Sequence, residues 1–265
     1  MNCYRHPERE AYVRCQRCER VICPECQVES SVGFLCPDDA GGAPKQVNRQ
    51  RIRSMQLGKP RVTLALLVIT TAIYLLQLSP FGRTIEIYFS YTPVATTIAP
   101  WQMITAAFLH GSWLHLIFNM YTLYIFGQVL EPMLGRARYL ALYLISAFGG
   151  SVAVLMFSDV TASVLGASGA IYGLMGAYFI LLRAIGQSSG QLMGLIAINL
   201  IFSFLNPGIS WQAHIGGLVV GGLVAAVYAG TRKAEQKGMQ IAGLVVLVAL
   251  LIGLSVYQVN AYGLL

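Results

Sequence analysis

Residues 166–183 read GASGAIYGLMGAYFILLR, an apolar run with Ser168 near its start and no charge before Arg183. Such a run predicts a helix inside a lipid bilayer. A polar side chain in that setting is expensive and usually functional. Three more polar residues stand in comparable apolar segments, namely His115, Asn119 and His214. Together the four provide the side chains that a serine hydrolase needs as nucleophile, base and oxyanion donors.

The composition extends this interpretation to the whole chain. Of the 265 residues, 56% are hydrophobic and 11% are charged, and the mean hydropathy is +0.62. This predicts an all-α polytopic membrane protein. Residues 1–61 nevertheless hold 11 of the 18 Lys and Arg residues and all six cysteines. We therefore expect a small Cys-rich head at residues 1–41, a basic linker at 42–61 and a membrane body at 62–260.

The head contains four pairs of metal-ligand residues, each with a gap of two residues. They are Cys3 and His6, Cys15 and Cys18, Cys23 and Cys26, and Cys36 and Asp39. No secretory signal is visible, so we expect a cytosolic head, where closely spaced cysteines indicate metal ligands before disulfides. Eight ligands fill two structural zinc sites, and the zinc would supply folding energy that so short a segment lacks. Asp38 is an alternative ligand to Asp39, and one zinc with spare thiols is an alternative to two.

This pattern resembles B-box-type zinc fingers, in which alternate pairs share one ion. The resemblance implies one zinc on Cys3, His6, Cys23 and Cys26 and another on Cys15, Cys18, Cys36 and Asp39. It does not identify a partner, so recruitment of a cytosolic protein, regulation, and redox or metal sensing all stay open as roles of the head. The basic linker predicts contact with anionic membrane lipids, and we expect no nucleic acid.

Charge-free stretches and turn signals predict seven membrane helices in the body. They are expected at residues 62–79, 113–130, 138–157, 168–183, 191–205, 212–230 and 239–258. Residues 80–112 form a long first loop, parts of which we expect in the membrane interface. With the head in the cytosol, six of the seven positive charges of the body fall on the inner side. This predicts a multi-pass protein with a cytosolic N-terminus and its C-terminus outside.

The same topology places the four polar residues at one depth. Ser168, His214 and the pair His115 and Asn119 each lie near the start of a helix that enters from outside. We expect Ser168 and His214 to form a dyad, because no carboxylate of the body is well placed to orient the imidazole. His115 and Asn119 share a helix face and can donate hydrogen bonds to an oxyanion, alongside the Ser168 amide.

Neighbouring residues support this site. Tyr172 lies one turn after Ser168 and can hold the imidazole by packing, while Gly217 and Gly221 share a helix face with His214. Small residues on one face let another helix approach closely, as contact between His214 and Ser168 requires. The other supporting residues are Gly166, Gly169 and His110.

These motifs, in this order, resemble the rhomboid family of intramembrane serine proteases. The resemblance rests on His115-x3-Asn119, on Gly166-x-Ser168-Gly169-x2-Tyr172 and on Ala213-His214-x2-Gly217-x3-Gly221. It implies a six-helix core with a seventh C-terminal helix, and cleavage of transmembrane proteins near the outer face through an acyl-enzyme on Ser168. Substrate is expected to enter laterally near residues 113–130 and 191–205. No cofactor is expected for catalysis.

Two further implications come with the family. Glu131-x3-Gly135-x2-Arg138 resembles a family pattern in the first inner loop, whereas the Trp-Arg pair of many members is missing from the first outer loop. The zinc head joined to this body resembles bacterial, particularly actinobacterial-type, rhomboids, which implies the plasma membrane. The main alternative is a catalytically silent rhomboid-like protein that binds membrane clients, although the complete Ser, His and Asn set favours an enzyme.

Overall fold

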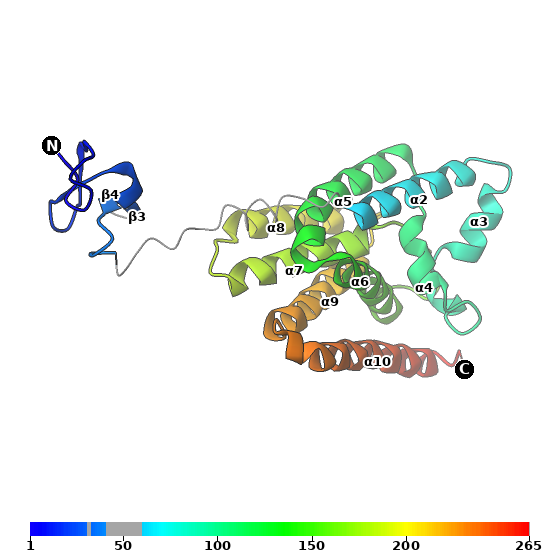
Figure 1. The fold of residues 1–265 in the computed structure, drawn as a ribbon. Helices are drawn as coiled ribbons and strands as arrows, with labels where there is room; N and C mark the ends of the chain where they lie inside the picture. Colours follow the sequence, from blue (N-terminus) through cyan, green and yellow to red (C-terminus); the bar gives the residue numbers. More distant parts are fainter. Residues whose placement is uncertain (31–32, 41–59, 265) are drawn as a thin grey trace. The chain divides into compact units, whose positions relative to one another are not determined.

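The computed structural model describes residues 1–30, 33–40 and 60–264. Contacts divide the chain into two units, Met1–Leu57 and Gly58–Leu265 (Figure 1). The predicted basic linker at residues 42–61 lies outside the described residues except for its last two positions.

The N-terminal unit is built from very short strands. Strands β1 (Val13–Arg14) and β2 (Val21–Ile22) form one antiparallel pair, and β3 (Val28–Ser30) and β4 (Gly33–Leu35) form another. A 3-10 turn, η1 (Pro24–Cys26), lies between the two pairs in sequence. Five of the seven residues in its buried cluster are cysteines, so apolar packing contributes little to this unit.

The body is helical, and its long helices lie close to the predicted segments (Figure 1). They are α2 (Arg61–Gln77), α5 (Trp113–Leu134), α6 (Arg136–Phe157), α7 (Ser168–Ala184), α8 (Gly190–Leu205), α9 (Trp211–Gly230) and α10 (Lys237–Ala261). Among the described residues, α6, α9 and the stretch Ala234–Ala261 are long and apolar enough to cross a membrane, and α2, α7 and α8 are apolar but shorter. The seven-span topology therefore stays a prediction.

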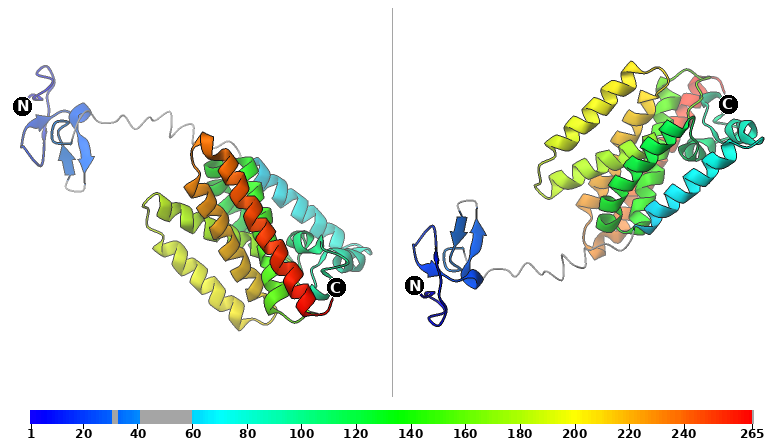
Figure 2. Two further views of the ribbon diagram at one scale, coloured as in Figure 1. Left: turned by 90° about the horizontal axis from the view of Figure 1, so that it is seen from below. Right: turned by 90° about the horizontal axis from the view of Figure 1, so that it is seen from above.

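The first loop is more ordered than the sequence suggested. It contains α3 (Gly82–Phe89), η2 (Pro93–Ala95), α4 (Gln102–Thr105) and η3 (Ala106–Phe108), seen at one end of the bundle in Figure 2. Tyr91 pairs with Val164, and the Gly166 amide donates to the Ala106 carbonyl at 2.9 Å. These bonds attach the loop to the segment that leads into α7.

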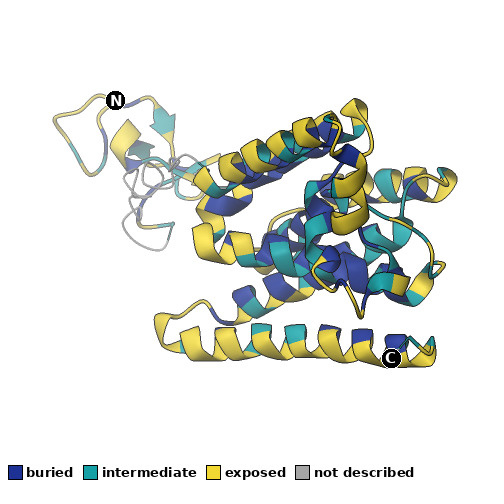
Figure 3. Cartoon of the chain, turned by 90° about the vertical axis from the view of Figure 1, so that its right-hand side faces the viewer, coloured by how far each residue is buried: buried dark blue, intermediate teal, exposed yellow. Residues whose placement is uncertain are grey.

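The centre of the body is a close contact between α7 and α9, with α6 packed against both. A side chain on Gly217 would overlap the Gly169 carbonyl, and one on Gly221 would overlap the Gly173 carbonyl. The prediction that Gly217 and Gly221 let another helix approach is therefore confirmed. In contrast, α10 packs on α6 and α9 along one side and exposes large apolar side chains along the other (Figure 3).

Candidate active site and metal centres

Ser168 is the first residue of α7. The chain turns into this helix through Gly166, whose φ of +131° is a backbone conformation that side chains rarely adopt. His214 lies in the first turn of α9. The Ser168 Oγ and His214 Nε2 atoms are 2.8 Å apart, across 46 residues of sequence. This is the distance of a hydrogen bond between a nucleophile and its base.

The His214 imidazole is enclosed on several sides. Its ring stacks on Tyr172, with centroids 4.1 Å apart and planes at 15°, and only 6% of the residue is exposed. This stacking is the geometry expected if Tyr172 holds the imidazole by packing. The imidazole Nδ1 lies 2.8 Å from Oγ of Ser203, a residue of α8 that is 3% exposed.

Two acidic side chains that follow α2 and α6 in sequence, Glu86 and Asp159, have other partners. Glu86 accepts a hydrogen bond from Gln77 at 3.2 Å, and Asp159 accepts two from Thr161. Ser203 therefore occupies the place next to Nδ1 that a carboxylate takes in a catalytic triad.

His115 and Asn119 are held near Ser168 by the start of α5. Ser112 caps this helix by accepting from the His115 amide at 3.2 Å, and the Asn119 side chain donates to the His115 carbonyl at 2.8 Å. A side chain at position 166 would collide with the His115 ring. Because Gly166 has none, the ring can lie against the segment that leads to Ser168.

A cavity of about 690 Å³ joins these residues. Its lining includes Ser168, His214, His115, Asn119, Tyr172, Gly166, Gly169 and Ser203. Phe118 of α5 and Phe202 of α8 line it as well, so the cavity lies between these two helices. Of the predicted site residues of the body, only His110 and the helix-packing glycines Gly217 and Gly221 do not line this cavity.

His110 is 1% exposed and lies behind His115, with ring centroids 4.8 Å apart. The Gln77 side chain holds it through both backbone groups, accepting from the amide at 3.0 Å and donating to the carbonyl at 3.3 Å. His110 is thus placed to support His115 without reaching the cavity.

Two residues with clear structural roles were not recognised from sequence. Ser203 is one, since it stands in an apolar helix without a motif around it. Glu131 is the other, because its buried carboxylate accepts from the Val62 amide and from the amide and hydroxyl of Thr63 at 2.8–2.9 Å. The carboxylate thereby caps the N-terminus of α2, where its negative charge interacts favourably with the positive end of the helix dipole. Its place in the Glu-x3-Gly-x2-Arg pattern was the available signal.

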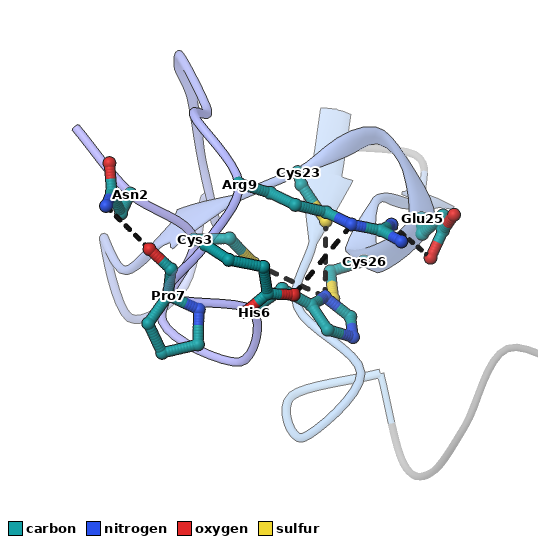
Figure 4. Close-up of polar contacts among 9 residues, drawn as sticks. Asn2, Cys3, His6, Pro7, Arg9, Cys23, Glu25 and Cys26 are labelled. Atoms are coloured by element: carbon teal, nitrogen blue, oxygen red, sulfur yellow. Dashed lines mark hydrogen bonds and ion pairs between the residues drawn. The ribbon is translucent and has the colours of Figure 1, made fainter.

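The first ligand cluster of the N-terminal unit surrounds His6 (Figure 4). The His6 Nδ1 atom lies 3.4 Å from the sulfurs of Cys23 and Cys26 and 3.9 Å from that of Cys3. A tetrahedral zinc would place sulfur and nitrogen ligands roughly 3.6 Å apart, given the usual bond lengths. Burial opposes ionisation of Cys3, but backbone hydrogen bonds from Cys23, Arg5 and His6 lower the pKa of its thiol to about 6. The set therefore fits a zinc ion.

The second cluster contains Cys15, Cys18, Cys36 and Asp39. The Asp39 carboxylate lies 3.2 Å from the Cys15 and Cys36 sulfurs, and the Cys18 and Cys36 sulfurs are 3.6 Å apart. Hydrogen bonds from Cys18, Cys36 and Cys15 lower the pKa of Asp39 to about 2. Asp38 instead pairs with Arg20 at 3.0 Å and accepts a hydrogen bond from Tyr4, and the ligand cluster contains Asp39 in its place. This donor set also fits zinc.

Comparison with known proteins gives the family of the body. The family described as the Rhomboid domain matches residues 98–232. The chain is 36% identical over 169 residues to the rhomboid protease GluP of Bacillus subtilis, covering 61% of this chain and 32% of that protein. It is 44% identical over 128 residues to the mitochondrial RHOMBOID-like protein 6 of Arabidopsis thaliana, covering 46% of this chain and 41% of the relative.

The chain also resembles a relative that it matches over most of the length of both proteins. The rhomboid protease GlpG of Yersinia pestis is 28% identical over 197 residues, which are 70% of each chain. The chain spans less than half the length of GluP and of the Arabidopsis protein. The family match covers half of this chain and all of its intramembrane polar motifs, and the apolar helices make it a membrane protein. The chain belongs to the rhomboid family.

Proposed function

We propose that this protein is an intramembrane serine endopeptidase that cleaves transmembrane proteins through a dyad of Ser168 and His214. The observation that carries the proposal is the 2.8 Å contact between Ser168 Oγ and His214 Nε2 at the wall of a cavity between apolar helices. Membership of a family with named proteases supports it.

In the proposed reaction, Ser168 Oγ attacks the scissile carbonyl carbon while His214 Nε2 takes the hydroxyl proton. The tetrahedral intermediate then collapses, the C–N bond breaks, and His214 returns the proton to the leaving amine. Water hydrolyses the acyl-enzyme by the same steps, with His214 acting as base towards water and then as acid towards Ser168. Stacking against Tyr172 restrains the imidazole plane throughout.

The oxyanion would be held by His115, Asn119 and the Ser168 amide. The Gly111 amide donates a hydrogen bond to His115 Nδ1 at 3.4 Å, so Nδ1 is the acceptor nitrogen of the neutral ring. The ring proton is then on Nε2, which lies near Gly166 and can donate to an oxyanion. The Asn119 side chain uses one of its two N–H groups on the His115 carbonyl, which leaves the other for an oxyanion.

The remaining proposals concern the setting of the reaction. Because α5 and α8 both line the cavity, we expect a transmembrane substrate to enter laterally between them. The positive charges near the inner helix ends favour a plasma-membrane protein with a cytosolic N-terminus, an outer C-terminus and cleavage near the outer face. The head would hold one zinc on each ligand cluster as a B-box-like finger, and the ions would supply its folding free energy.

A serine-reactive fluorophosphonate tests the proposal directly. The full chain, purified in detergent, is compared with Ser168→Ala and His214→Ala variants, and each is also assayed on a model transmembrane substrate. We expect labelling and cleavage only when both residues are present, with unchanged thermal unfolding in the Ser168→Ala variant. A folded wild-type protein that neither labels nor cleaves would instead favour the silent client-binding function.

A further inference from the structure

The hydroxyl of Ser203 takes part in three close contacts at the back of the His214 ring. Its Oγ lies 2.8 Å from His214 Nδ1, 2.8 Å from the Asn199 carbonyl oxygen and 3.4 Å from the Tyr172 hydroxyl. Ser203 is 3% exposed, so water does not compete freely for these bonds. A bond from a helical serine to the carbonyl four residues earlier is common by itself, but the contact with Nδ1 is not explained by it.

Counting hydrogens assigns a direction to each bond. A serine hydroxyl has one hydrogen to donate and two lone pairs to accept with. The Asn199 carbonyl can only accept, so an oxygen–oxygen distance of 2.8 Å requires the Ser203 hydrogen. The bond to His214 must then run the other way, with Nδ1–H donating to Ser203 Oγ. The second lone pair is left for the weaker contact with Tyr172.

We propose that Ser203 is a positioning residue that holds the His214 imidazole in the Nδ1-protonated tautomer. In that tautomer Nε2 is free to accept the Ser168 proton, as the proposed reaction requires. When the imidazole becomes a cation, the same hydroxyl accepts a charge-assisted bond from Nδ1–H and the Asn199 carbonyl polarises it further. The inference rests on the proposed dyad and adds a third member contributed by α8.

The position of Ser203 makes the dyad depend on a third helix. Ser168 belongs to α7 and His214 to α9, whereas Ser203 belongs to α8, which packs against both. A displacement of α8 at this level breaks the Nδ1 bond without touching the bond between Ser168 and His214. The base is therefore correctly oriented only while α8 is docked.

The tautomer can be measured on the unmodified protein. The full chain contains four histidines, so a sample with ¹⁵N-labelled imidazoles in detergent gives few signals, and the His214→Gln variant identifies those of His214. At about pH 8, where an ordinary imidazole is neutral, we expect the proton on Nδ1. A proton on Nε2 would overturn the inference even if every variant failed to fold.

Variants then test the function of the bond. We expect Ser203→Ala to lower kcat about 10-fold with KM unchanged, because it leaves a buried N–H without its acceptor. Ser203→Thr, which keeps the hydroxyl, should restore most of the rate. Ser255→Ala is the matched control, since Ser255 is a buried serine of α10 bonded in the same way to the carbonyl four residues earlier.

The outcomes separate this inference from the proposed function. Wild-type activity with an equally active Ser203→Ala variant refutes the role of Ser203 and leaves the dyad standing. An equal loss in Ser203→Ala and Ser255→Ala, or no recovery in Ser203→Thr, also refutes it, because general packing then explains the effect. An inactive wild type overturns both proposals.

Discussion

Replacing Gly217 with alanine should separate α7 from α9 at the level of the dyad. The new Cβ would overlap the carbonyl oxygen of Gly169, the residue that follows Ser168. A carbon atom meets a carbonyl oxygen at about 3.3 Å or more, so the helices must move apart by roughly 1 Å at this level. Because Gly217 is one turn from His214, the movement lengthens the 2.8 Å contact between Ser168 and His214.

The expected magnitudes follow from this displacement. Overpacking a tight contact costs about 1–3 kcal/mol of unfolding free energy, while glycine to alanine in a helix returns at most about 1 kcal/mol. A misplacement of about 1 Å in an active site can cost on the order of 100-fold in rate. We therefore expect a modest loss of stability and a large loss of activity.

A matched control lies on the same helix. A Cβ on Gly222 would sit 3.7 Å from Ile180 and 3.9 Å from the Gly176 carbonyl oxygen, which are ordinary contacts. Both variants are assayed for fluorophosphonate labelling and for thermal unfolding in detergent. Gly222→Ala should behave as wild type or be slightly more stable. Equal activity of the Gly217 and Gly222 variants would show that the close contact of α7 with α9 does not position the dyad.

Three more predictions concern other parts of the chain. Metal analysis of the full protein should find two zinc ions, and Asp39→Ala should lose one of them while Asp38→Ala keeps both; equal zinc contents in the two variants would contradict the ligand assignment. Glu131→Gln should lower the unfolding free energy by about 1–3 kcal/mol, measured by thermal unfolding, because one oxygen no longer accepts at the start of α2. Gly166→Ala should strongly reduce substrate cleavage, because the φ of +131° at residue 166 and the adjacent His115 ring both exclude a side chain. A wild-type cleavage rate in this variant would show that the turn at Gly166 does not position His115.

The long helices of the body were predictable because their signals are local. An apolar run and its flanking turn residues lie within one stretch of chain, so α7 begins at Ser168 and α8 ends at Leu205 as expected. The main deviation is α5, which continues past residue 130 to Leu134 and includes Pro132. Proline near a helix end removes few hydrogen bonds, and Glu131 is buried as a cap rather than placed in a loop.

The candidate site was only partly predictable. Ser168, His214, His115 and Asn119 stood out because polar residues are costly in apolar segments. Ser203 has the same polarity but no motif, and its meaning depends on the Nδ1 atom of a residue on another helix. The direction of that bond follows from the Asn199 contact inside α8 together with the contact to His214 on α9, and no spacing in the sequence encodes the contact between helices.

The sequence by itself determined the membrane character, the helix positions and the pairing of candidate ligands in the head, because hydropathy and two-residue gaps act over short stretches of chain. Only the tertiary structure decided that Asp39 rather than Asp38 meets the thiols, that Glu131 caps a helix 68 residues away, and that Ser203 backs the imidazole. The physical reason is that hydrogen bonds require atoms within about 3 Å of each other. Residues far apart in sequence reach such distances only when close packing, as between Gly169 and Gly217, sets the positions of whole helices.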